Sequence, residues 1–328
     1  MKKRIISLFM VFIMLFSISA CAGKHTDYGK DKNFKDVNIA SLKGPTSMGL
    51  AKLYNDAGKD KKFNYKIVQT PDEIVAGLAK GEIDIAAVPA NLASVLYNKT
   101  DGKLLKITNI NTLGVLYIVS MDKNVKTFKD LKGKVIVSSG KGATPEYILR
   151  ELLINNKINP DRDVKIEYKS SHEEVVSSIV KKEADIALLP EPFLTAVETK
   201  VNFKNVISLN DVWKKSFNQD MITGVTVVRN EFLINHKDFV EGFLKDYKNS
   251  VEYVNENPKE ASEIIGNLGI IDKNIAQKAI PSCNIVFIEG KDMIKALNKY
   301  YEVLDLNDKT SIGGKMPDEE IYYKEQIK

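Results

Sequence analysis

The sequence predicts an α/β protein with two lobes, each of them a mostly parallel sheet flanked by helices, joined by two crossing strands. Three observations predict this fold class. A unit of strand, turn and helix occurs twice, short apolar strands alternate with helices in both copies, and a β-branched strand follows each copy. Alternating strands and helices are typical of parallel sheets that are covered by helices on both faces.

The first 20 residues have the layout of a secretory signal peptide, with a basic head (KKR, residues 2–4), an apolar run and then small residues. The run is shorter than the ~20 residues that a membrane-spanning helix needs, so cleavage is favoured over an uncleaved anchor. Residues 18–21 read ISAC and resemble a bacterial lipobox. This resemblance implies a diacylglyceryl group on Cys21 and anchoring of the mature chain to a membrane. Residues 21–35 are predicted to be a polar tether.

The length and composition limit the possible architectures and partners of the remaining chain. A length of 328 residues allows two domains with separate cores. Basic and acidic residues are interspersed along the whole length, which argues against a nucleic-acid partner. With Cys21 lipidated, Cys283 has no partner for an intrachain disulfide, and we expect it to be a small buried apolar group.

The repeat aligns EIVAGLAKGEIDIAAVPANLA, from Glu73, with EVVSSIVKKEADIALLPEPFL, from Glu174, at an offset of 101 residues. KGPT and KGAT, which start at Lys43 and Lys141, are 98 residues apart. Each half reads as strand, turn, helix, strand, helix, strand, turn and helix. The expected strands are Asn38–Leu42, Asn64–Val68 and Ile83–Val88 in the first half, and Lys134–Ser138, Val164–Tyr168 and Ala184–Leu189 in the second.

Two further apolar segments, Thr112–Ser120 and Ile222–Asn230, each follow one half and each contain a glycine. We interpret them as the strands that carry the chain into the second lobe and back. Lobe one is then 36–115 with 224–328, and lobe two is 116–223. The chain after about Glu231 is expected to be helical and to pack on lobe one. Two connections make a hinge, and the groove between the lobes is the expected binding site.

The sequence resembles the solute-binding lipoproteins of ABC importers in three features. These are the lipobox, the paired glycine–threonine turns, and the segment GEIDIAAVP with its repeat KEADIALLPEP. The similarity extends over most of residues 36–328 and is to the branch of nitrate, sulfonate, taurine and thiamine-precursor binders. It implies a type II periplasmic-binding-protein fold, monomeric and without a cofactor, outside the cytoplasm. The closed form would dock on a membrane permease driven by an ATPase. The resemblance does not identify the ligand: a sulfonate, another oxyanion, a pyrimidine or another heterocycle all remain open.

The residues themselves predict the same groove, because ligands of parallel α/β sheets bind beyond the carboxyl ends of the strands. The turns at those ends start helices, whose free N–H groups attract electron-rich ligands. Each candidate also has a structural interpretation, such as a helix cap for Thr46 and Thr144 or a first-turn acid for Glu191. Tyr117 is the candidate aromatic wall, or else packs in the hinge. The candidate ligand-binding residues are Gly44, Pro45, Thr46, Ser47, Ala90, Asn91, Tyr117, Gly142, Ala143, Thr144, Pro145 and Glu191.

Other chemistry finds little support. No arginine is placed for a bidentate carboxylate clamp, the three histidines lack ligand-spaced partners for a metal, and no phosphate loop or GxSxG motif occurs. An enzyme on the same scaffold, related to thiamine-pyrimidine synthesis, would need a base in the cleft, and the sequence offers hydroxyls and one acid but no histidine nearby. We therefore expect no enzyme. A surface sensor is the other alternative.

Overall fold

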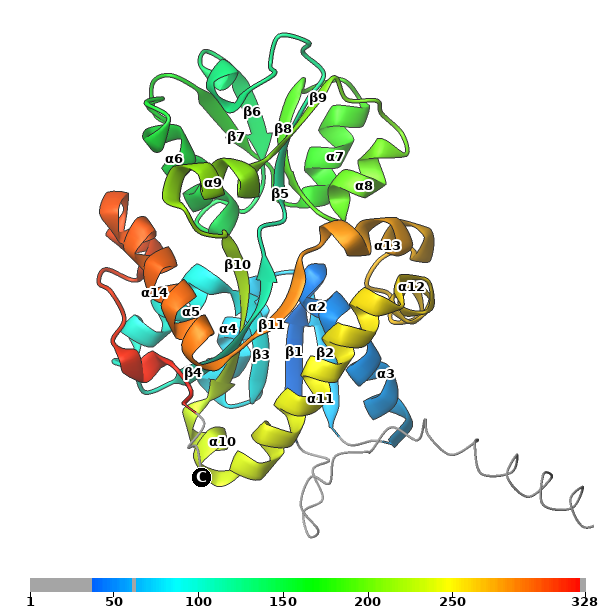
Figure 1. Cartoon of the computed structure of the whole chain (residues 1–328), viewed down its shortest axis with the longest axis vertical. Helices are drawn as coiled ribbons and strands as arrows, with labels where there is room; N and C mark the ends of the chain where they lie inside the picture. Colours follow the sequence, from blue (N-terminus) through cyan, green and yellow to red (C-terminus); the bar gives the residue numbers. More distant parts are fainter. Residues whose placement is uncertain (1–36, 61–62, 325–328) are drawn as a thin grey trace, which may run out of the picture.

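The computed structural model describes residues 37–60 and 63–324; the predicted signal peptide, the tether and Cys21 lie outside the described residues. Two sheets form two lobes, one above the other in Figure 1. The six-stranded sheet of lobe one has the order β11-β4-β10-β3-β1-β2. Its strands are β1 (Asn38–Leu42), β2 (Asn64–Val68), β3 (Ile85–Pro89), β4 (Leu105–Leu113), β10 (Ile222–Arg229) and β11 (Ile285–Ile288).

The five-stranded sheet of lobe two has the order β7-β6-β8-β5-β9. Its strands are β5 (Leu116–Ser120), β6 (Val135–Ser138), β7 (Lys165–Tyr168), β8 (Ile186–Pro190) and β9 (Asn205–Ser208). All six strands expected from the repeat are present, with shifts of at most two residues at their ends. The two-lobed α/β fold predicted from the sequence is thus confirmed.

The strands of the repeat pair in parallel, as expected, but each sheet as a whole is mixed. In lobe one, β1 pairs in parallel with β2 and β3, whereas β10 is antiparallel to both β3 and β4. In lobe two, β5 is antiparallel to β8 and β9. The strand that enters each sheet from the other lobe, β10 in lobe one and β5 in lobe two, runs against the strands of the repeat. In lobe one, β11 also runs against them, although it follows the helices of lobe one.

The segment Thr112–Ser120 is not one continuous strand. It contains the end of β4, a break at Gly114 and Val115, and all of β5. A Cβ atom on Gly114 would lie 2.6 Å from Asn210 Oδ1, so the chain passes from one sheet to the other where only glycine fits without a shift.

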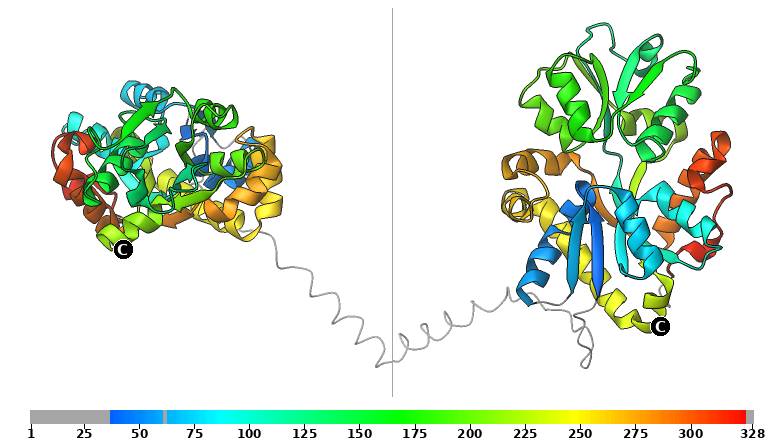
Figure 2. Two further views of the ribbon diagram at one scale, coloured as in Figure 1. Left: turned by 90° about the horizontal axis from the view of Figure 1, so that it is seen from above. Right: turned by 180° about the vertical axis from the view of Figure 1, so that it is seen from behind.

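Helices cover both faces of each sheet (Figures 1 and 2). Those of lobe one are α2 (Pro45–Gly49), α3 (Ala51–Asp60), α4 (Pro71–Lys80), α5 (Ala90–Lys99), α10 (Asn230–Asn235), α11 (Lys237–Glu256), α12 (Pro258–Asn267), α13 (Lys273–Ala279) and α14 (Gly290–Asn307). Those of lobe two are α6 (Thr144–Asn155), α7 (His172–Val180), α8 (Phe193–Glu198) and α9 (Leu209–Phe217). Short 3₁₀ turns occur at Phe128–Leu131, Ile280–Ser282, Lys309–Ile312 and Glu319–Ile321.

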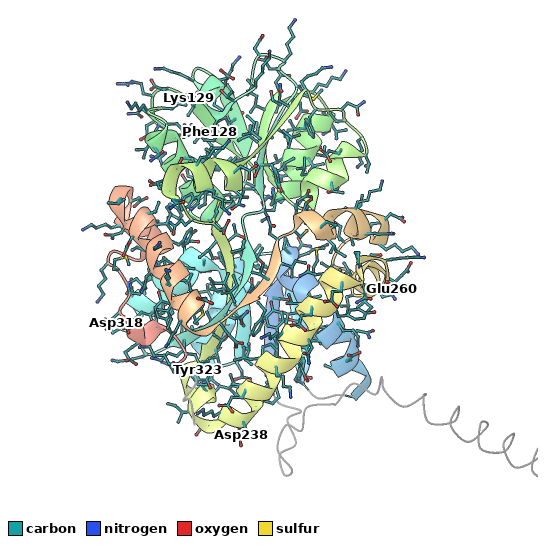
Figure 3. All side chains as sticks on the ribbon, viewed as in Figure 1. Phe128, Lys129, Asp238, Glu260, Asp318 and Tyr323 are labelled. Carbon is teal, nitrogen blue, oxygen red and sulfur yellow. The ribbon has the colours of Figure 1, made fainter. Side chains whose placement is uncertain are left out.

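The C-terminal part packs on lobe one as expected and adds one strand, β11, that the sequence analysis did not predict. In general, apolar side chains are buried and charged side chains face the solvent. Phe128 is buried in lobe two, whereas the adjacent Lys129 is exposed, as are Asp238 and Glu260 on lobe one (Figure 3). Cys283 is fully buried, as predicted. In the part of the chain that the structure describes, we find no helix with the length and apolarity required to span a bilayer.

Candidate functional site

A cavity of about 150 Å³ lies between the lobes at the carboxyl ends of the repeated strands. Both glycine–threonine turns contribute to its wall, so the two halves of the repeat face each other across it. The lining residues are Leu42, Lys43, Gly44, Pro45, Thr46, Pro89, Thr112, Val115, Leu116, Thr144, Pro145, His172, Pro190, Glu191, Phe193 and Thr223.

The turn of lobe one connects β1 to α2. Gly44 has φ 132° and ψ −152°, a conformation that a residue with a side chain rarely adopts. Thr46 donates its hydroxyl hydrogen bond to the Leu42 carbonyl at 2.8 Å, which orients its methyl group. Ser47 is fully buried, with its Oγ 2.8 Å from Ser41 Oγ, and it does not line the cavity.

The turn of lobe two connects β6 to α6 and contacts lobe one directly. The Thr144 hydroxyl donates to Asn91 Oδ1 at 2.7 Å, and Asn91 Nδ2 donates in turn to the Ser311 carbonyl at 3.2 Å. Asn91 lies in the first turn of α5 of lobe one, so this chain of hydrogen bonds connects the two lobes. Gly142 and Ala143 line an adjoining groove of about 720 Å³ together with Asn91.

Some of the N–H groups near the helix N-termini at the cleft already have acceptors within the protein, so they are less available to an anionic ligand than expected. The Gly142 N–H at the start of α6 already donates to Glu146 Oε2 at 2.6 Å. At the start of α7, the Ser171 hydroxyl accepts from the Glu174 N–H at 3.2 Å, and the Glu174 carboxylate accepts from the Ser170 N–H at 3.2 Å. These carboxylates occupy part of the positive ends of both helices.

Glu191 places a carboxyl group in the cavity wall between β8 and α8. Its side chain is 4% exposed, and its Oε2 accepts from the Thr195 N–H at 3.1 Å. Burial raises the pKa of Glu191, and the Thr195 N–H opposes this shift. No lysine or arginine of the described residues forms a salt bridge with it.

His172 and Phe193 also line the cavity, and neither was predicted from the sequence as a binding residue. Their rings lie 4.9 Å apart at the starts of α7 and α8. His172 Nδ1 is 2.6 Å from Ser139 Oγ, and burial lowers the pKa of His172 to about 4, so the ring is neutral at pH 7. The expectation that no histidine lies near the cleft was therefore wrong. His172 follows β7, the second strand of its half, and the carboxyl end of this strand also points toward the cleft.

Two other candidates are placed away from the cavity. Ala90 is fully buried, and its carbonyl accepts a hydrogen bond from the Tyr301 hydroxyl at 2.9 Å. Tyr117 lies on β5 and packs against the core of lobe two instead of lining the cavity. Burial and the nearby Glu191 charge raise the pKa of Tyr117 to about 12. Val115 and Leu116, the residues just before it, line the cavity.

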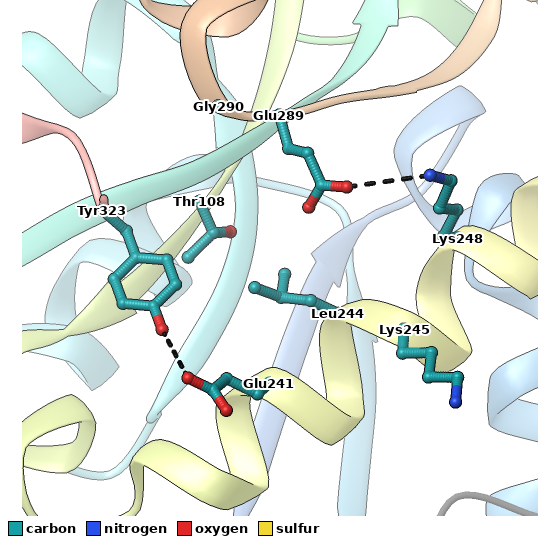
Figure 4. Close-up of a pocket in the computed structure, with 8 residues that line it drawn as sticks. All are labelled: Thr108, Glu241, Leu244, Lys245, Lys248, Glu289, Gly290 and Tyr323. Atoms are coloured by element: carbon teal, nitrogen blue, oxygen red, sulfur yellow. Dashed lines mark hydrogen bonds and ion pairs between the residues drawn. The ribbon is translucent and has the colours of Figure 1, made fainter. Parts of the chain in front are cut away.

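A second pocket, of about 280 Å³, lies on lobe one alone, between α11, β4 and the start of α14 (Figure 4). Across it, the Tyr323 hydroxyl donates to Glu241 at 3.3 Å, and Lys248 pairs with Glu289 at 3.8 Å. Glu241, Lys248 and Glu289 are thus already engaged with neighbouring groups. In residues 37–60 and 63–324, no three His, Cys, Asp or Glu side chains are arranged to hold a metal ion.

Comparisons with known proteins agree with this geometry. A family described as "ABC transporter, phosphonate, periplasmic substrate-binding protein" matches residues 51–211. A Bacillus subtilis protein named as an aliphatic sulfonates-binding protein is 24% identical over 95% of this chain and 96% of its own length.

Two solved structures share the fold. The crystal structure of an ABC transporter protein from Parabacteroides distasonis has a TM-score of 0.72 and 23% identity, over 89% of this chain and all of its own. The periplasmic aliphatic sulphonate-binding protein of Escherichia coli has a TM-score of 0.66 and 14% identity, over 82% of this chain and 85% of its own. At these identities the structures establish the architecture alone.

Proposed function

Because the chain is the solute-binding component of an ABC import system, we propose that it captures a small solute between Thr46 and Thr144. The closed form then delivers the solute to a membrane permease driven by an ATPase. The observation that supports this most directly is the cavity itself, because residues from both repeated turns line it. A ligand that contacts both lobes favours the closed form through its higher affinity for that form.

The cavity supplies several weak contributions in place of one strong anchor. Micromolar affinity requires about 8 kcal/mol, whereas each neutral hydrogen bond contributes about 1 kcal/mol. The hydroxyl groups of Thr46 and Thr144 and the apolar surfaces of Pro45, Pro145 and Phe193 support a site of this kind. Gly44, Glu191 and His172 complete the proposed site, with Asn91, Gly142 and Ala143 in the adjoining groove.

The protein acts outside the cytoplasm, and we propose that a lipid on Cys21 holds it at the membrane, with residues 21–35 as the tether. The signal-peptide layout and the ISAC motif support this assignment. Several acyl chains together, at ~0.8 kcal/mol per buried methylene, hold a protein stably on a bilayer. We also propose lobe boundaries of 36–115 with 224–328 for lobe one and 116–223 for lobe two.

A thermal-shift screen of the purified protein tests the proposed site. The probes are methanesulfonate, taurine, nitrate, methylphosphonate, cytosine, 4-aminopyrimidine and benzylamine. A probe at 100 times its dissociation constant should stabilise the protein by ~2.7 kcal/mol. Replacing both Thr46 and Thr144 by valine should remove the shift, because both hydroxyls are lost from the cavity wall while the size of each side chain is kept.

Thr100→Val is the matched control. Thr100 donates to the carbonyl four residues before it at 2.8 Å, as Thr46 does, but it lies at the far end of α5. The control should keep the full shift. If the double variant folds and also keeps the full shift, the site has been assigned to the wrong residues.

A further inference from the structure

We infer that the solute presents an N–H or ammonium donor to Glu191, and that it is a small amine or nitrogen heterocycle and not a simple oxyanion. This inference rests on the proposed function and names the ligand class for the same cavity. The observation behind it is a carboxyl group, 4% exposed, in the cavity wall without a cationic partner. A carboxylate accepts hydrogen bonds but offers none to an oxyanion.

The arginines that the structure describes are engaged outside the cavity. Arg150 pairs with Asp161 at 2.9 Å, and Arg162 lies 3.3 Å from Asp163. Arg229 pairs with Asp84 at 2.9 Å. An anionic ligand would therefore lack the bidentate partner that favours carboxylates, phosphates and related oxyanions.

The other charges at the cavity do not compensate for Glu191. Lys43 is part of the lining, but its side chain is exposed. His172 is neutral at pH 7, because burial lowers its pKa to about 4. Near the starts of α6 and α7, the N–H groups of Gly142, Ser170 and Glu174 already donate to Glu146, Glu174 and Ser171. A buried oxyanion next to the Glu191 carboxylate would thus face repulsion between like charges.

The shape of the wall favours a flat ligand. Four prolines, at positions 45, 89, 145 and 190, line the cavity with the paired rings of His172 and Phe193. Flat and rigid surfaces of this kind pack well against a small ring, and an aromatic face also attracts a cation. A planar ring with an amine or ring N–H fits both the walls and the acceptor.

Isothermal titration calorimetry with two sets of probes tests the inference. The N–H probes are cytosine, 4-aminopyrimidine and benzylamine; the oxyanion probes are methanesulfonate, nitrate and methylphosphonate. At least one N–H probe should bind, and Glu191→Gln should weaken its binding by about 10- to 100-fold, the effect of losing a hydrogen bond to a charged group. Glu198→Gln is the control, because Glu198 is an exposed carboxylate at the other end of α8.

The pH dependence of the wild-type protein is a second readout that needs no variant. Affinity for benzylamine should rise as the pH rises above 4.5, the ordinary pKa of glutamate, because the Glu191 carboxyl loses its proton in this range. The groups around Glu191 are Lys43, Tyr117, His172, Glu198 and Cys283. Glu191→Gln should flatten the curve. Glu198→Gln should keep the rise but move it to lower pH, because the charge of Glu198 raises the pKa of Glu191.

Two results would overturn the inference. One is binding of an oxyanion probe that Glu191→Gln leaves unchanged or tightens, with affinity rising as the pH falls; capture between the lobes would then still stand. The other is the failure of every N–H probe to bind at millimolar concentration. If no probe of either set binds and the threonine variants also have no effect, the proposed function fails together with the inference.

Discussion

At the scale of single residues, His172 shows how burial sets the chemistry of the cleft. Its ring lies between Ser139 and Phe193, and burial lowers its pKa from 6.5 to about 4. A neutral imidazole presents one donor and one acceptor, so it contributes directional hydrogen bonds without charge. A neutral imidazole therefore adds no charge to a cavity whose wall already contains a buried acid, Glu191.

The same shift predicts how stability depends on pH. Below pH 6.5 the unfolded chain binds a proton at His172, whereas the folded protein resists protonation until about pH 4. The contribution of His172 is therefore full above pH 6.5 and falls as the pH drops, by ~3 kcal/mol at pH 4. Urea unfolding from pH 4 to 7 should show a shallower loss for His172→Asn than for the wild type. Parallel curves for the two proteins would contradict the assignment.

At the scale of elements, strand β10 connects the core of lobe one to the cavity. Gly224 on β10 is opposite Pro89 on β3 and Thr112 on β4, both of which line the cavity. A Cβ atom at Gly224 would lie 2.4 Å from Asn111 Oδ1 and 3.0 Å from Thr46 Cγ2. The close packing of β10 therefore sets the position of the lobe-one turn.

Gly224→Ala should lower the free energy of unfolding by about 1–3 kcal/mol, the usual cost of overpacking. It should also weaken the binding of whichever probe the wild-type protein binds, because Thr46 must shift. Urea unfolding and calorimetry measure the two effects.

The matched control for Gly224→Ala is Gly58→Ala in α3. Its Cβ would meet only the Tyr65 hydroxyl, at 3.9 Å, and alanine in a helix should stabilise by about 0.5–1 kcal/mol. Unchanged binding in Gly224→Ala would mean that β10 does not position the turn.

At the scale of the whole molecule, side chains of the two lobes contact each other. The Thr144–Asn91 hydrogen bond is one such contact, and the packing of Trp213 of α9 against Tyr300 of α14, with ring centroids 5.7 Å apart, is another. A neutral hydrogen bond contributes about 1 kcal/mol, which changes an equilibrium by less than tenfold. The empty protein is therefore expected to sample open forms, and a ligand that contacts both lobes to suppress them.

Small-angle scattering should report this closure. A bound probe should reduce the radius of gyration, and it should also reduce acrylamide quenching of Trp213, the single tryptophan of the chain. The variant with valine at positions 46 and 144 should show neither change at the same probe concentration. An unchanged radius at saturation in the wild-type protein would contradict capture by closure.

The sequence by itself determined the architecture of this protein. The duplicated pattern located six strands, the helices between them and the two turns at the cavity, because hydrophobic period and turn residues are local properties. Tertiary structure alone decided that β10 runs antiparallel between β3 and β4, that β11 joins the sheet, and that His172 and Phe193 meet at the wall. It also decided that Ser47 faces the core while Thr46 faces the cavity, although they are neighbours. These outcomes depend on contacts between residues far apart in the chain, and no local pattern encodes such contacts.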